Sequence, residues 1–315
     1  MGNVSFSRMA SRRAFTLLEL LVTISIIAIL ASLLLPVLSK GKGRAQGVYC
    51  LNNSKQMMVA MLLYVGDNQD FFPPNPDDGN IAAGYNWCSG QAGIGEAQEF
   101  DPDVLKDPKQ SLLITYLAGN ISVFHCPADR RMGKYQGTNP SFIGQMIPAA
   151  RTYSMNQAIG TIDPGYDKTG PGGQPEITHS GAPVLPVNGP WLNNKDNHRR
   201  NSPWSTYGKE SQIGGPGPAM LWVLVDEDAR GLNDAAFAFE MEGADAGGPA
   251  WIDTPGTYHS GSCGFAFADG HSEIHHWLST AAKSFGAGSR QIDPDDLRDQ
   301  QDWTWMQQRT SARAK

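Results

Sequence analysis

One unbroken apolar run near the N-terminus limits what this chain can fold into more than any other feature. Between Phe15 and Leu38 the only ionisable side chain is Glu19. At ~1.5 Å of rise per residue, a helix over this run is long enough to cross a hydrocarbon core of about 30 Å. The sequence therefore predicts a membrane-spanning helix over residues 15–38, preceded by a basic leader over residues 1–14.

Glu19 is the unusual residue of this run. An acidic side chain inside a bilayer costs at least ~2.5 kcal/mol and needs a partner. We expect no other side chain of the segment to be that partner. Cleavage between Ala14 and Phe15 would create an α-ammonium group on Phe15, on the same helical face as Glu19. The carboxylate thus predicts a proteolytic cut that supplies its cation, within the chain or from a neighbouring copy.

These residues resemble the signature of the type IV pilin and type II secretion pseudopilin superfamily. The signature is a short basic leader, a small residue, Phe-Thr-Leu-x-Glu and an apolar helix, and here it is filled by Ala14, Phe15, Thr16, Leu17, Leu18 and Glu19. The resemblance implies that a membrane-embedded prepilin peptidase cleaves before Phe15 and methylates its new amine. It also implies that Glu19 helps to align subunits in a filament. Ala14 departs from the glycine usual before the cut, and it is small enough to replace it.

A secretory signal peptide and a plain membrane anchor are the alternatives for the same run. A signal peptide would end in small residues, whereas this run ends in Leu35-Pro36-Val37-Leu38 and exceeds the usual apolar length of about 7–15 residues. A plain anchor would have no need of Glu19. Both alternatives are therefore less favoured than the pilin-like interpretation.

Composition and charge bound the rest of the chain. Apolar residues make up 40% of the 315 residues, enough for a core, and 35 glycines with 21 prolines favour short elements joined by many loops. The formal net charge of −6 argues against a general nucleic-acid binder. Basic residues flank the apolar run on both sides, so charge does not set its orientation. The pilin resemblance implies a single-pass protein of the inner membrane, with a cytoplasmic N-terminus and a periplasmic or extracellular C-terminal domain.

A second helical stretch is expected over residues 39–66, after a kink favoured by Pro36. Its apolar residues are spaced as in a one-sided amphipathic helix, at Val48, Leu51, Met58, Leu62 and Val65. The resemblance then implies an α+β, pilin-like fold, in which this helix packs on an antiparallel sheet within a globular domain over residues 67–285.

A hairpin is predicted over residues 259–277. Residues 264–268 form one strand, Asp269-Gly270 a tight turn, and residues 271–277 the return strand. The His-x9-Asp-Gly spacing from His259, together with Cys126-Pro127-x-Asp, resembles a branch of the pilin-like superfamily that is abundant in planctomycetes. We expect His259 to hydrogen-bond the turn around Asp269, and Cys126 and Pro127 to have structural roles.

Three sets of residues could in principle bind a metal ion. We nevertheless predict no cofactor. His271, Glu273 and His275 alternate onto one strand face and could ligate zinc, although a solvated polar face is favoured. The acidic run 226–228 and a calcium set are likewise expected to be solvated loops. That calcium set is Asp67, Asn68, Asp70, Asp77 and Asp78. The four cysteines match no zinc pattern and are expected to be either disulfides, at most two, or buried thiols.

The remaining segments are predicted to form short elements, loops and a C-terminal tail. Residues 111–117 are expected to be helical, and residues 151–156 and 219–225 to be strands. Residues 161–212 are expected to be an insertion of surface loops. The tail over residues 286–315 is expected to dock by Trp303 and Trp305 or to be a frayed end.

Two functions follow from these patterns. The first is a structural pilin or pseudopilin subunit, whose partners are the prepilin peptidase and N-methyltransferase and other subunits. The alternative is a membrane-anchored exoplasmic carbohydrate-binding or hydrolytic domain that uses its tryptophans and the acidic run 226–228. The sequence contains no nucleophile elbow, HExxH, P-loop or glycine-rich nucleotide motif, so we predict that the chain is not an enzyme.

Overall fold

A computed structural model of the chain describes residues 16–76, 86–162, 185–187, 189, 191–193, 203–242, 249–279 and 290–314. The chain divides into two units, residues 1–44 and residues 45–315. The predicted leader with Ala14, the cleavage residue Phe15 and much of the predicted insertion 161–212 lie outside the described residues.

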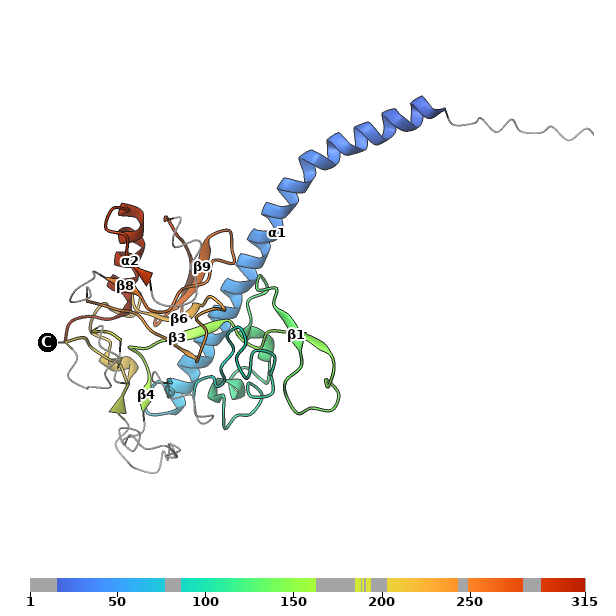
Figure 1. Cartoon of the computed structure of the whole chain (residues 1–315). Helices are drawn as coiled ribbons and strands as arrows, with labels where there is room; N and C mark the ends of the chain where they lie inside the picture. Colours follow the sequence, from blue (N-terminus) through green and yellow to red (C-terminus); the bar gives the residue numbers. More distant parts are fainter. Residues whose placement is uncertain are drawn as a thin grey trace, which may run out of the picture. The chain divides into compact units, whose positions relative to one another are not determined.

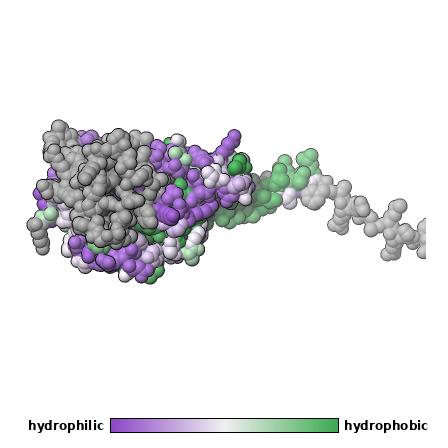
Figure 2. Space-filling model, turned by 90° about the horizontal axis from the view of Figure 1, so that it is seen from below, coloured by the Kyte–Doolittle hydropathy of each residue, from purple (hydrophilic) through white to green (hydrophobic). Residues whose placement is uncertain are grey.

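The first unit contains the start of one long helix, α1 (Leu17–Asp67). Every leucine, isoleucine and valine from Leu17 to Leu38 is exposed, and Figure 2 shows apolar surface along this helix. The helix includes a segment long and apolar enough to cross a membrane, no part of which is buried within the chain. α1 continues without a break through Pro36, since one proline removes a single backbone hydrogen bond. The predicted apolar helix is confirmed, and it has the length and composition of a membrane anchor.

The part of α1 in the second unit buries one face in the core of that unit. The buried residues recur every three or four positions, as predicted for an amphipathic helix. However, Leu51 and Leu62 are only half-buried and Val48 is exposed, so the buried face is displaced from the predicted stripe. Its members are Cys50, Asn53, Ser54, Met57, Met58, Ala60, Met61, Tyr64 and Val65. The prediction weighted large aliphatic residues, whereas several small and polar side chains face the sheet.

A five-stranded mixed sheet forms the centre of the second unit (Figure 1). Its strand order is β10-β9-β6-β3-β7, and all neighbours are antiparallel except β3 and β7, which are parallel. The strands are β3 (Tyr153–Asn156), β6 (Trp222–Asp226), β7 (Ala236–Phe237), β9 (Ser262–Phe267) and β10 (Ser272–His276). The predicted α+β fold class, with a long helix packed on a largely antiparallel sheet, is confirmed.

The two faces of the sheet carry different cores because side chains alternate along each strand. On β9, Phe265 and Phe267 join an aromatic core, whereas Ala266 joins the core that contains α1. A Cβ atom at Gly264 would lie 3.4 Å from Cys50 Sγ, so glycine leaves room for α1 to lie against this strand. The second helix, α2 (Leu297–Thr310), covers the aromatic face (Figure 1).

Short elements complete the unit. The 3-10 helices are η1 (Leu112–Thr115), η2 (Ile121–Phe124) and η3 (Glu210–Gln212). Three small antiparallel pairs are β1 (Met132–Lys134) with β2 (Met146–Pro148), β4 (Thr161–Ile162) with β5 (Leu185–Pro186), and β8 (Ala250–Trp251) with β11 (Arg290–Gln291). The predicted helical segment at 111–117 and the predicted strands at 151–156 and 219–225 correspond to η1, β3 and β6.

The predicted hairpin is β9 and β10, joined by the turn at Asp269-Gly270. Their register pairs Ser272 with Ala266 and His276 with Ser262. Gly270 has φ of +90°, a conformation that glycine adopts without strain. The tail forms β11 and α2, and Trp303 and Met306 of α2 are buried in the aromatic core, so the tail docks through its apolar face.

Candidate functional sites at the helix start and in the core

The first candidate site is the start of α1, where Thr16 and Glu19 form a reciprocal cap. The backbone N–H and the hydroxyl of Thr16 donate to Glu19 Oε2 at 2.9 and 2.8 Å, and the Glu19 N–H donates to Thr16 Oγ1 at 3.2 Å. This is the capping box of a helix N-terminus. The expectation that no side chain of the segment partners Glu19 is therefore wrong, because the Thr16 hydroxyl donates to it, although the described residues supply no cation.

The second candidate site is a cluster of four buried side chains that the fold gathers from four elements. Cys50 lies on α1, Cys126 follows η2, Asp226 ends β6 and His259 precedes β9. Their potential ligand atoms all lie within 4.8 Å of one another. Two thiols, an imidazole and a carboxylate are all groups that bind transition metals. We refer to these four residues as the Cys-Asp-His cluster.

Three distances define the cluster. Cys126 Sγ lies 3.3 Å from His259 Nε2, Cys50 Sγ lies 3.6 Å from Asp226 Oδ2, and His259 Nε2 lies 3.7 Å from Asp226 Oδ2. The hydroxyl of Tyr153 lies 2.7 Å from Cys50 Sγ and borders the cluster. Burial raises the pKa of Asp226 to about 7, against the lowering effect of hydrogen-bonding neighbours.

Helix α1 holds the turn that carries Cys126. Gln46 Nε2 donates to the Pro127 carbonyl at 2.8 Å, and Asn53 Nδ2 donates to the His125 carbonyl at 3.1 Å. Gln46 and Asn53 lie one turn before and one turn after Cys50, so all three share one face of α1. The carbonyls on either side of Cys126 are therefore bonded to the helix that presents Cys50. Pro127, predicted to be structural, takes part through its carbonyl.

Asp129 closes the same turn. Its Oδ1 accepts from the Arg131 N–H at 2.9 Å, its Oδ2 accepts from Arg131 Nη2 at 2.8 Å, and His125 Nε2 lies 3.6 Å from Oδ2. Burial alone raises the pKa of Asp129, but His125 and Arg131 outweigh it and lower that pKa to about 2. The carboxylate is therefore stabilised in its charged form.

Replacing Asp129 by asparagine is expected to lower the free energy of unfolding by about 2 kcal/mol at pH 7. The unfolded pKa of aspartate is about 3.9, so the stabilisation is fully present above that value and is lost as pH falls through about 2. Denaturant titrations of the wild type and Asp129→Asn at pH 7 and pH 3 measure the difference. The difference should shrink at pH 3, and an equal difference at both pH values would contradict the role of the charge.

The acidic run 226–228 at the end of β6 is buried. The prediction that it forms a solvated loop is therefore wrong. Asp226 and Glu227 are fully buried, and Asp228 is 7% exposed. Adjacent strand residues point to opposite faces, so Asp226 enters the Cys-Asp-His cluster and Glu227 does not. Burial raises the pKa of Glu227 well above its ordinary value. Asp228 pairs with Arg230 at 2.8 Å.

His259 does not bond the turn at Asp269, so that expectation is wrong. Its side chain contacts Cys126 and Asp226 instead. The reason is the extended strand β9, which separates the two ends of the His-x9-Asp-Gly motif by roughly 20 Å. Asp269 accepts from the backbone N–H of His271 at 3.1 Å, within the hairpin turn.

The cysteines and the other predicted metal ligands have different surroundings. All four cysteines are buried, free thiols. Of the predicted zinc set, His271 Nδ1 lies 2.5 Å from Asp269 Oδ1, His275 stacks on Trp305, and Glu273 is exposed. The two histidines therefore each contact a residue outside that set.

The described members of the predicted calcium set form hydrogen bonds with other parts of the chain. Asp67 accepts from the Tyr116 hydroxyl at 3.2 Å, Asn68 donates to the Tyr64 carbonyl at 2.7 Å, and Asp70 accepts from the Ser211 N–H at 3.2 Å. Asp77 and Asp78 lie outside the described residues. The described members therefore hold the end of α1 and the loop after it.

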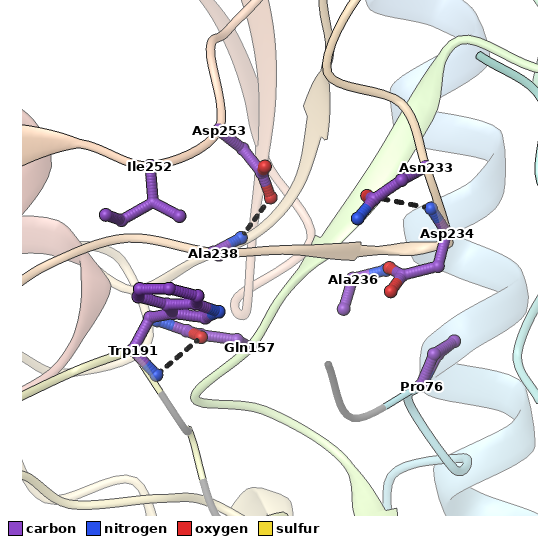
Figure 3. Close-up of a pocket in the computed structure, with 9 residues that line it drawn as sticks. All are labelled: Pro76, Gln157, Trp191, Asn233, Asp234, Ala236, Ala238, Ile252 and Asp253. Carbon is purple, nitrogen blue, oxygen red and sulfur yellow. Dashed lines mark hydrogen bonds between the residues drawn. The ribbon is translucent and has the colours of Figure 1, made fainter. Parts of the chain in front are cut away.

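A separate pocket of about 130 Å³ lies beside β7 (Figure 3). It presents two carboxylates, but both accept backbone hydrogen bonds: Asp253 from the Ala238 N–H at 2.6 Å and Asp234 from the Ala236 N–H at 2.7 Å. These carboxylates therefore hold the chain in and next to β7. The residues that line the pocket are Pro76, Gln157, Trp191, Asn233, Asp234, Ala236, Ala238, Ile252 and Asp253.

Comparison with known proteins bears on the first candidate site. Residues 9–35 match the family model described as the prokaryotic N-terminal methylation motif. Neither the curated proteins nor the solved structures yield a significant match. The chain therefore carries a prepilin-type N-terminal methylation motif, which covers the predicted cleavage position and the first part of α1.

Proposed function

We propose that the chain is a pilin-like or pseudopilin structural subunit. A prepilin peptidase cleaves it between Ala14 and Phe15 and methylates Phe15, and the mature chain assembles through α1 into a type IV pilus or a type II secretion pseudopilus. The observation that carries this proposal is the match of residues 9–35 to the methylation motif, together with the exposure of every leucine, isoleucine and valine of α1 from Leu17 to Leu38. Exposed apolar surface of this extent needs lipid or other helices to cover it.

The same proposal places the protein in the inner membrane. The leader would remain cytoplasmic until it is cleaved, and the unit that begins at residue 45 would be periplasmic or extracellular. The partners are then the peptidase, the surrounding lipid and other subunits of the same kind. The His-x9-Asp-Gly hairpin supports a place in the pilin-like branch that it resembles, with a structural rather than an enzymatic role.

The alternative function, carbohydrate binding or hydrolysis, relied on exposed tryptophans and on the acidic run 226–228, and we propose the subunit role in preference to it. Five of the eight tryptophans are buried, and Trp191, Trp204 and Trp305 are half-buried. The acidic run at the end of β6 is buried, so its carboxylates do not face solvent as paired catalytic groups would.

Intact mass tests the processing step. Full-length protein expressed with a prepilin peptidase should lose residues 1–14 and gain one methyl group, whereas protein expressed without it should keep its full mass. Ala14→Leu is the matched control, because a bulky side chain at the small-residue position should leave the chain uncleaved with the peptidase present. A wild-type chain that keeps residues 1–14 when the peptidase is active would contradict the proposed function.

A further inference from the structure

The Cys-Asp-His cluster has the geometry of a closed metal site. Metal–ligand distances of about 2.0–2.3 Å in a tetrahedral zinc site separate the ligand atoms from one another by roughly 3.3–3.8 Å. Three of the six ligand–ligand distances in the cluster, 3.3, 3.6 and 3.7 Å, fall in this range, and all six are within 4.8 Å. Four protein ligands leave no open position for a reacting water, and this is typical of structural sites rather than catalytic ones.

The surroundings of Asp226 point independently to a bound cation. This carboxylate is fully buried, and its Oδ1 has no hydrogen-bond partner among the described residues. Among the described residues, Asp226 Oδ2 forms an ion pair with His259 Nε2, at 3.7 Å. Its Oδ2 also accepts from Cys50 Sγ at 3.6 Å, but a fully buried carboxylate whose second oxygen has no partner is only partly compensated for its lost hydration. A divalent cation at the centre of the cluster would supply the missing charge.

We propose that Cys50, Cys126, Asp226 and His259 bind one zinc ion, which fastens α1 to the sheet of the second unit. Thiolate and imidazole ligands in tetrahedral arrangement favour zinc over calcium and magnesium, which take oxygen ligands. Binding involves no change of oxidation state: the two thiols each release a proton to solvent as their sulfurs bind the ion. Tyr153, within 2.7 Å of Cys50 Sγ, is placed to donate a hydrogen bond to that thiolate.

The consequence for the protein is mechanical. The ion would join the membrane-anchored helix to the turn after η2, to the end of β6 and to the segment before β9. A load on α1 would then pass directly to the sheet. Apolar packing between α1 and the sheet would no longer carry that load alone. This inference does not depend on the proposed filament assembly, because the whole cluster lies within residues 45–315.

Elemental analysis of the full-length protein, purified in detergent without added metal or chelator, tests the site. The wild type should contain about one zinc ion per chain, and Cys126→Ser should contain at least tenfold less. Cys88→Ser is the matched control, because Cys88 is also a fully buried thiol of the α1 core but lies outside the cluster. Its zinc content should equal that of the wild type. Equal zinc in Cys126→Ser would mean adventitious metal and would overturn the proposal.

Cobalt substitution keeps the test decisive if Cys126→Ser does not fold. The chelator-stripped wild type with cobalt(II) should show thiolate-to-metal charge transfer and the visible bands of a tetrahedral ion, and His259→Gln should weaken both. Added zinc, but not calcium, should raise the unfolding temperature by about 5–10 °C at concentrations far above its dissociation constant. A metal-free wild type whose mass is two hydrogens lower than that of the reduced chain, and whose proteolytic digest contains the Cys50 and Cys126 peptides joined to each other, would show a Cys50–Cys126 disulfide and would overturn the proposal. So would a reduced wild type that takes up no cobalt.

Discussion

Glu19→Ala is expected to abolish incorporation into filaments while leaving membrane insertion and cleavage at Phe15 unchanged. The apolar run that inserts is intact in this variant, and the cut lies four residues upstream of the change. What is lost is the carboxylate that would pair with the α-ammonium group of Phe15 on the same or a neighbouring subunit. In a bilayer such a pair is strongly favoured, because an unpaired charge there is costly. The measurement is the amount of processed subunit in sheared or sedimented filaments, relative to the amount in the membrane.

The capping box at the start of α1 provides the controls that separate charge from helix capping. Glu19→Gln keeps a side-chain oxygen that can accept from the Thr16 N–H, but it removes the charge. Thr16→Val removes the hydroxyl that bonds Glu19 but keeps the charge. If charge pairing drives assembly, Glu19→Gln should fail to assemble and Thr16→Val should assemble. The reverse result would reduce Glu19 to a capping residue.

Arg151→Ala is expected to destabilise the globular unit more than any single change at its surface. The guanidinium is fully buried and donates to three backbone carbonyls, those of Tyr153 at 2.6 Å, Asp234 at 2.7 Å and Gly90 at 2.8 Å. These carbonyls belong to β3, to the segment before β7 and to the loop after Trp87, so one side chain joins three parts of the chain. Alanine would leave them buried without a partner, at an expected cost of about 3–5 kcal/mol.

Thermal unfolding measures this effect, with a fall in midpoint on the order of 10 °C expected for a domain of this size. Arg298→Ala is the matched control: Arg298 pairs with Asp296, but its side chain is 63% exposed. Exposed ion pairs contribute little, so that variant should unfold close to the wild-type temperature. Similar midpoints for Arg151→Ala and the wild type would mean that water replaces the guanidinium without penalty.

The sequence predicted correctly those elements that depend on the pattern of consecutive residues. The apolar helix follows from an uninterrupted run of side chains, and the hairpin follows from Asp269-Gly270 between two strand-like segments. The buried face of α1 was predicted less well. Its spacing was right, but Cys50 and Ser54 are small or polar and carry little weight in an apolar pattern. Their burial depends on Gly264 across the interface, which lets the helix approach β9.

The sequence alone predicted the apolar helix and the hairpin, because each depends on contacts between residues close in the chain, and the resemblance carried by residues 14–19 implied the α+β character. The positions of Asp226, Glu227 and His259 follow from the packing of elements that are distant in the sequence. A strand residue such as Asp226 has a solvated or a buried side depending on which elements cover the sheet. The Cys-Asp-His cluster draws on residues 50, 126, 226 and 259, whose separations match no local metal-binding pattern. The packing of α1, η2, β6 and β9 around a common point therefore determined that cluster.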